Sequence, residues 1–78
     1  MLISKKKYKL DSKKMHFDIL KKLNTIKKPQ RFLTEKINVS RATLCRMSKG
    51  KKIDFDTFLI LLNWLEESPE KYITEKNI

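Results

Sequence analysis

The 78-residue chain contains one cysteine, Cys45, one histidine, His16, and one glycine, Gly50. A single cysteine excludes a disulfide within the chain, and together with a single histidine it excludes the four-ligand sets that hold structural zinc. A single glycine excludes a glycine-rich phosphate loop. The serine, histidine and acidic residues do not have the spacing of a hydrolytic Ser-His-acid triad. The neighbouring carboxylates Glu66 and Glu67 point apart on a helix. We therefore expect no enzymatic activity, no metal site and no cofactor.

Long apolar runs are also missing. The longest, Phe58 to Leu62, falls well short of the ~18 residues that a membrane span needs. The start, Met-Leu-Ile-Ser-Lys-Lys-Lys, lacks the apolar stretch of a signal peptide. These features predict one cytoplasmic domain with no membrane association. A domain of this length buries only roughly 60% of the surface of its unfolded chain. Surface buried against a partner would therefore add to its stability.

Acidic residues are scarce before residue 54. Residues 1–53 hold 17 Lys and Arg against three acids, a net charge of +14. Residues 54–78 hold two lysines against six acids, a net charge of −4. A lysine-rich coding bias would raise the total of +10 but would not remove lysine from the later residues. The asymmetry predicts an oriented molecule whose basic part faces a polyanion.

The segment 30–52, QRFLTEKINVSRATLCRMSKGKK, has the pattern of two short helices joined by a tight turn. A spacing of four separates Leu33 from Ile37, and a spacing of three separates Leu44 from Met47. Each spacing places two apolar side chains on one helical face. The segment therefore predicts two helices that pack together through these faces.

Residues suited to helix ends support this pattern. The first helix is expected over 29–37 and the second over 40–48. Asn38 tolerates the left-handed backbone that a sharp helix stop requires. Ser40 suits the N-cap of the second helix, and Gly50 suits its left-handed end.

This segment resembles the helix-turn-helix of the lambda-repressor/Cro-like (XRE) family of DNA-binding domains, and the similarity runs from about residue 13 to about residue 74. The matching positions are Gln30, Leu33, Glu35, Lys36, Val39, Ser40, Arg41, Thr43, Arg46, Gly50 and Lys51. Three positions depart from the family pattern: Thr34 replaces the usual alanine, Asn38 the usual glycine and Ser48 a common glutamate.

The resemblance implies an all-α fold, a compact five-helix lambda-repressor-like DNA-binding domain over residues 12–75. A basic N-terminal arm, residues 1–11, precedes this domain, and a loose tail, residues 76–78, follows it. The three further helices are expected at 12–27, from Asp54 onward, and from Pro69 to about Glu75. Each start has a residue suited to the N-cap, namely Ser12 or Asp11, then Asp54, then Ser68.

The leader 1–11 has three interpretations, and the sequence does not choose among them. It can be a disordered tail. It can be an arm that lies along DNA, as in some relatives, through Lys5, Lys6 and Lys7. It can be a short strand that packs on the body through Ile3, Tyr8 and Leu10.

The outer face of the second short helix carries the predicted base contacts. A major groove about 12 Å wide admits one helix, whose N-terminal side chains reach base edges best. Arginine can donate two hydrogen bonds to guanine, and alanine can touch a thymine methyl group. We therefore predict base reading by Arg41 and Arg46, with Ala42 and Cys45 as close neighbours. The alternative for each arginine is a solvated charge or a phosphate clamp, and only basic neighbours favour a redox role for Cys45.

Other residues are predicted to contact phosphates. Relatives place phosphates at the first turn of the first short helix, where backbone N–H groups are free, and around the glycine after the second. The candidates are Gln30, Ser40, Thr43, Lys49, Lys51 and Lys52. His16 lies beside the apolar stripe of helix 12–27 and is interpreted as a boundary histidine.

The helix that starts at Asp54 is apolar on more than half of its circumference. Surrounding helices can cover this surface, or part of it can form a homodimer seam together with the last helix. The candidates for that seam are Ile60, Leu61, Trp64, Tyr72 and Ile73.

Three functions fit these patterns. The first is a sequence-specific regulator of transcription that binds double-stranded DNA, acting as a homodimer and repressing by site occupancy. The second is an antitoxin that binds a toxin protein through its acidic C-terminal part, residues 54–78, and autoregulates its operon. The third, a basic surface for membrane or RNA, has least support because Phe and Trp concentrate in one helix.

Overall fold

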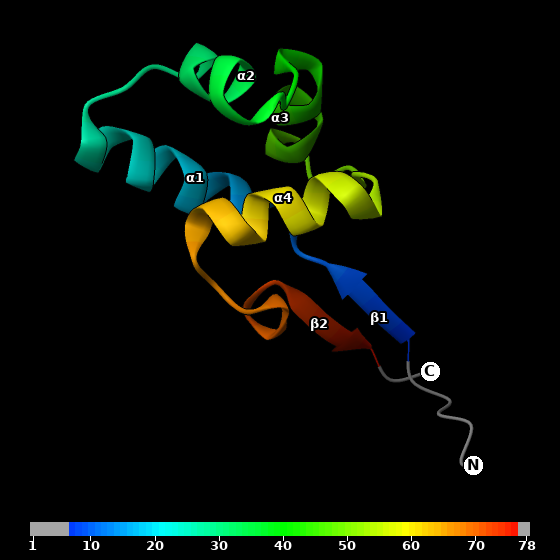
Figure 1. Ribbon diagram of the computed structural model, residues 1–78. Coiled ribbons are helices and arrows are strands. Elements are labelled where there is room, and N and C mark those ends of the chain that lie inside the picture. The colour runs from blue at the N-terminus through cyan, green and yellow to red at the C-terminus, as the bar shows by residue number, and fades with distance from the viewer. Residues whose placement is uncertain (1–6, 77–78) are drawn as a thin grey trace.

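The computed structural model describes residues 7–76, with side chains from 8 to 74, and this part is mostly helical with a small two-stranded sheet (Figure 1). The elements in order are β1 (Lys7–Leu10), α1 (Ser12–Ile26), α2 (Arg31–Ile37), α3 (Arg41–Ser48), α4 (Phe55–Leu65), the 3-10 turn η1 (Pro69–Lys71) and β2 (Ile73–Lys76). No helix in the described residues has the length and apolar character to traverse a bilayer.

Local capping defines where the helices begin. The N-cap side chains that accept a hydrogen bond from the N–H group three residues later are Asp11, Ser40 and Asp54. The predicted caps at Ser40 and Asp54 are confirmed, and α1 uses Asp11 rather than Ser12. The hydroxyl of Ser12 is instead buried, with no hydrogen-bond partner among the residues that the structure describes. Each cap satisfies a backbone donor that the helix itself leaves free.

Left-handed residues end the helices. The φ angle is 58° at Asn38 and 75° at Gly50, so both predicted stops are confirmed. Lys27 and Glu66 also have positive φ, 57° and 59°, at the ends of α1 and α4. This conformation costs a residue with a Cβ atom about 1–2 kcal/mol.

One core joins all four helices and the C-terminal segment. Helix α1 packs against α3 and α4, and α2 lies beside α3 (Figure 1). The buried apolar residues are Met15, Ile19, Leu23, Leu33, Val39, Leu44, Met47, Phe58, Leu61, Leu62, Leu65 and Tyr72. The predicted faces of the two short helices, at Leu33, Leu44 and Met47, are therefore inward, while Ile37 is half-buried.

The fifth helix predicted for 69–75 is wrong. Helical structure stops at Lys71, and β2 pairs antiparallel with β1, with Leu10 opposite Ile73. Ile73 and Thr74 are β-branched and favour strands when a partner is available. Of the three interpretations of the leader, a strand is confirmed for 7–10, where Leu10 packs against the core but Tyr8 is exposed. Ile3, Lys5, Lys6 and the side chain of Lys7 lie outside the described part of the chain, so the predicted DNA arm stays a prediction.

A hydrogen-bonded cluster anchors this segment to α1. The hydroxyl of the fully buried Tyr72 donates to the Asp18 carboxylate at 2.7 Å. The Lys71 ammonium lies 3.2 Å from Asp18 and 2.8 Å from Glu67. Partial burial raises the pKa of Asp18, but hydrogen bonds from Tyr72 and Lys71 and the lysine charge outweigh burial, so this pKa is lowered overall. The carboxylate thus stays ionised and accepts both bonds.

Candidate nucleic-acid interface

The α2–turn–α3 unit is held by its own backbone and one hydroxyl. The Thr34 hydroxyl donates to the carbonyl of Val39 at 2.8 Å, directly across the turn. The N–H of Val39 donates to the carbonyl of Leu33, and both of these side chains are buried. Thr34, where the resembled family usually has alanine, therefore adds a bond that stabilises the turn.

Helix α3 has one buried and one open face. Leu44 and Met47 are buried toward α1, and Thr43 is also buried. The exposed residues of α3 and its C-cap are Arg41, Ala42, Cys45, Arg46, Ser48 and Lys49. This face follows from the 3.6-residue period, because positions 41, 45 and 48 share one side of a helix.

A shallow hollow of about 440 Å³ lies between this open face and α1. Apart from the buried Leu44, the residues that line it are His16, Gln30, Arg41, Ala42, Cys45 and Ser48. A neighbouring hollow of about 370 Å³ is lined by Pro29, Gln30, Arg31 and Arg41. The structure thus brings together three of the four predicted base readers and Gln30, and no acidic residue lines either hollow.

Arg46 lies apart from that hollow. Its guanidinium donates to the Thr43 hydroxyl at 3.3 Å. Hydrogen bonds from Thr57 lower the pKa of Asp54, and the charge of Arg46 contributes to the same shift. Arg46 is therefore on the side of α3 that faces the start of α4, although its side chain is exposed. The structure therefore separates Arg46 from the other three predicted base readers, and its predicted contact with DNA stays a prediction.

The two hydroxyls predicted to contact phosphate, those of Ser40 and Thr43, make hydrogen bonds within the chain. The Ser40 hydroxyl accepts from the Thr43 N–H at 3.1 Å and lies 2.9 Å from the Thr43 hydroxyl. Thr43 retains only 8% of its accessible surface. The Thr43 hydroxyl helps to hold the start of α3, and the phosphate contacts predicted for Ser40 and Thr43 stay predictions.

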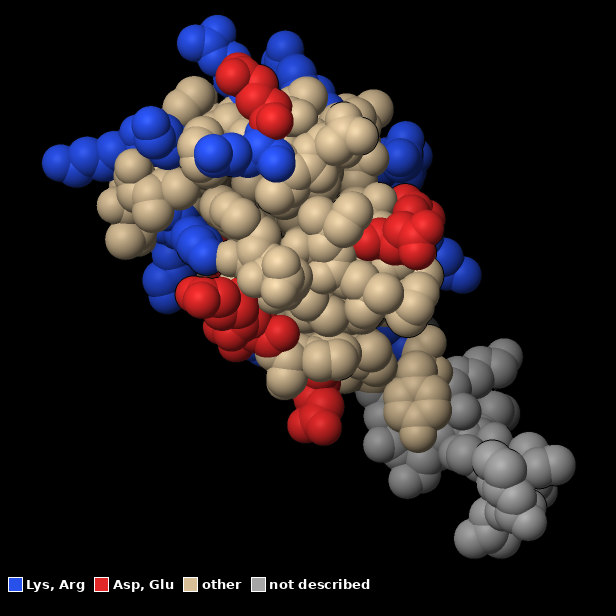
Figure 2. Space-filling view, in the orientation of Figure 1, with Lys and Arg blue, Asp and Glu red and all other residues tan. Residues whose placement is uncertain are grey.

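Basic residues surround the far end of α3. Lys49, Lys51 and Lys52 are exposed in the connection to α4, and Gly50 packs against Lys13 of α1. A hollow of about 430 Å³ beside them is lined in part by Lys9, Lys13 and Lys49. Figure 2 shows Lys and Arg side chains gathered around the end formed by α1, α2 and α3, and uncharged side chains over the middle of the view, where α4 lies. The charge asymmetry of the sequence is thus a spatial asymmetry.

The residues predicted for a dimer seam do not form one surface. Leu61 and Tyr72 are fully buried in the core of the single chain, so they are unavailable to a partner. Ile60 and Ile73 are 42% and 39% exposed. Trp64 is half-buried and stacks under the Lys22 ammonium, 4.6 Å from the ring centroid.

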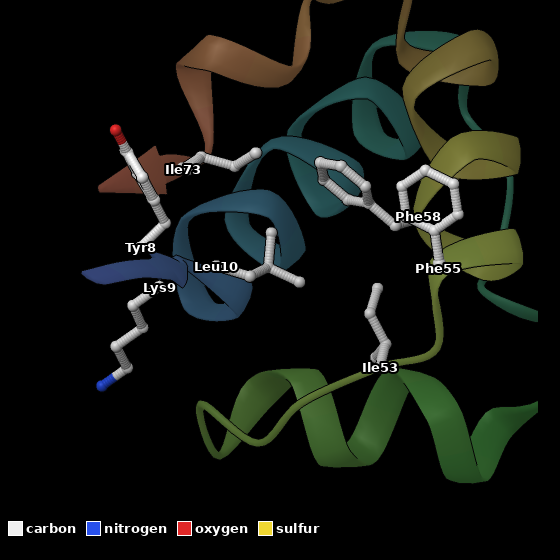
Figure 3. Close-up of a pocket in the computed structure, with 7 residues that line it drawn as sticks. All are labelled: Tyr8, Lys9, Leu10, Ile53, Phe55, Phe58 and Ile73. Carbon is white, nitrogen blue, oxygen red and sulfur yellow. The ribbon is translucent and has the colours of Figure 1, made fainter. Parts of the chain in front are cut away.

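An apolar hollow at the sheet was missed by the sequence reasoning. Its volume is about 270 Å³, and Figure 3 shows side chains from both strands facing those of α4 and the loop before it. The lining residues are Tyr8, Lys9, Leu10, Ile53, Phe55, Phe58 and Ile73. Phe55 and Tyr8 are 69% and 63% exposed. The sequence signal for this hollow was Phe55, an aromatic residue directly after the N-cap Asp54. The first turn of a helix is commonly exposed to solvent, so a large apolar side chain there is unusual.

Comparison of the chain with protein-family models, with curated proteins and with solved structures found no significant match.

Proposed function

We propose that this protein is a sequence-specific DNA-binding regulator of the lambda-repressor/Cro-like type, in which α3 enters the major groove. The observation that carries the proposal is the open face of α3. Arg41, Ala42 and Cys45 line one hollow with Gln30, and no carboxylate lies among the lining residues to neutralise the arginine. Direct base readout uses an arginine at the exposed N-terminal turn of a helix, and none of the described carboxylates is in a salt bridge with Arg41.

Charged and polar groups on both sides of α3 support this orientation. Gln30 and Arg31 lie beside the N-terminal turn of α3, and Lys49, Lys51 and Lys52 lie beyond its C-terminal end. A helix in a groove has phosphates along both walls. The flanking groups would bind these phosphates and fix the register, and α3 would read the bases between them.

The small reading surface favours a homodimer. One short helix contacts only a few base pairs, so two copies with recognition helices about 34 Å apart would read two half-sites one turn apart. Occupation of such a site would exclude other proteins, and repression is the simplest outcome. The partly exposed apolar residues Ile60 and Ile73 remain candidates for the contact between copies.

Selection of bound duplexes from a random library tests the proposal. Arg41→Ala should relax the preference at one base position by roughly 1–3 kcal/mol. Lys51→Ala should weaken all duplexes alike and reduce the slope of log affinity on log salt by roughly 0.9.

The matched control is Lys21→Ala, because Lys21 is exposed and lines a different hollow beside Asp18 and Glu67. It should leave affinity nearly unchanged. Equal losses for the Lys21 and Lys51 variants, or a uniform loss for Arg41→Ala, would contradict the assignment of the α3 face.

A further inference from the structure

The only histidine of the chain lies at the candidate interface. His16 projects from α1 into the hollow that Arg41, Ala42 and Cys45 of α3 also line. Its neighbours in the sequence, Met15 on one side and Phe17 on the other, are fully buried and 65% exposed respectively. His16 itself is half-buried and lies between these two environments, at the border of the α1–α3 contact. Its position therefore depends on how the two helices pack.

The groups around His16 are basic or neutral. From α3 the Arg41 guanidinium and the Cys45 thiol face the same hollow, and Gln30 faces it from the segment before α2. On α1 itself, Lys13 lies one turn earlier. Partial burial lowers the pKa of His16, and no acidic residue lines the hollow to offset this effect. The imidazole is therefore mainly neutral in the free protein at pH 7.5.

A bound polyanion would favour the protonated form of His16. When a helix lies in the major groove, an element set beside it meets the phosphate wall rather than the base edges. His16 is on α1, beside α3, and it shares its hollow with Gln30, which begins the neighbouring helix. A phosphate at this point would have a neutral imidazole within reach, and only the protonated ring offers both nitrogens as donors and a positive charge.

We propose that His16 is a proton-linked phosphate contact, so that one proton is taken up when duplex DNA binds and the affinity rises as the pH falls. This inference rests on the function proposed for the α3 face. The pKa of His16 is higher in the complex than in the free protein. The added affinity is therefore present at low pH and is lost as the pH rises through the pKa of the complex.

Affinity for a random-sequence duplex, measured at pH 5.5 and pH 8.0 and constant ionic strength, tests the inference. The wild type should bind about tenfold more tightly at pH 5.5, a factor that corresponds to about 1.4 kcal/mol. Its salt slope should also be steeper by roughly 0.9 at pH 5.5. His16→Gln should remove both differences, and His16→Arg should bind tightly at both values. Any group other than residue 16 that titrates in this range is common to all three proteins.

Proton NMR gives an independent readout. The chain has one histidine, so the titrating resonances of the two carbon-bound imidazole protons both belong to His16. The midpoint should rise when duplex is added. If DNA binds but the midpoint stays unchanged and His16→Gln keeps the pH effect, the inference is overturned and the proposed function stands. If the pH effect is confined to duplexes with one particular base pair, His16 contacts a base, and the phosphate assignment is overturned. Absence of binding at both pH values in low salt would remove the proposed function itself.

Discussion

Replacement of Tyr72 by phenylalanine isolates one hydrogen bond that links the C-terminal segment to α1. The ring of Tyr72 is fully buried and would remain in place, while the 2.7 Å bond to Asp18 would be lost. A hydrogen bond to a charged group contributes about 1.5–3 kcal/mol. Lys71 still pairs with Asp18 in the variant, so we expect the lower end, about 1.5 kcal/mol of unfolding free energy. For a domain of this size the melting temperature should fall by roughly 6–12 °C.

Urea unfolding followed by circular dichroism measures this change, and the pH dependence adds a second test. The pKa of Asp18 is lowered in the folded protein, so its contribution is present above the unfolded pKa and is lost as the pH falls through the folded pKa. As the pH is lowered from 6 into the acid range, the unfolding free energy of the wild type should therefore fall by more than that of Tyr72→Phe.

The matched control is Tyr8→Phe, which removes the hydroxyl of an exposed tyrosine and should change stability by less than about 0.5 kcal/mol. Equal stability of Tyr72→Phe and wild type, or an equal loss in both variants, would refute the anchoring role of the Tyr72–Asp18 bond.

Two further predictions concern residues with positive φ. Glu66→Gly should raise the unfolding free energy by about 0.5–1 kcal/mol, because glycine relieves the left-handed strain but gives the unfolded chain more freedom. Glu67→Gly, one residue later and without positive φ, should not stabilise the protein in the same urea titration. Gly50→Ala should destabilise by about 1–2 kcal/mol, because φ is 75° and the new methyl group would lie 3.1 Å from Cε of Lys13. A Gly50→Ala variant as stable as the wild type would show that this turn readily adapts.

Features decided by neighbouring residues could be predicted from the sequence. The cap at Ser40, the stop at Asn38 and the cap at Asp54 each depend on groups within a few positions. The open face of α3 follows from helical periodicity once its ends are known. The four helices and the candidate base-contact face could therefore be located without coordinates.

Features decided by distant residues could not be predicted in this way. Strand β2 exists because Ile73 pairs with Leu10, far away in the chain, and the local Ser-Pro-Glu signal favoured a helix instead. The position of His16 at the α3 face depends on the packing of α1 on α3, which no spacing encodes. The charge of Arg46 also acts on Asp54 at the start of the next helix, and no local spacing places these two groups together.

Alkylation of Cys45 tests the central claim most directly. Cys45 is the only cysteine, it is exposed, and it lies on the face of α3 proposed to enter the groove. With duplex DNA at ten times its Kd, the reaction of Cys45 with N-ethylmaleimide should slow by about tenfold, because only the free fraction reacts. If the duplex is bound but Cys45 reacts at the rate of the free protein, DNA lies on another face, and the placement of α3 in the groove is contradicted.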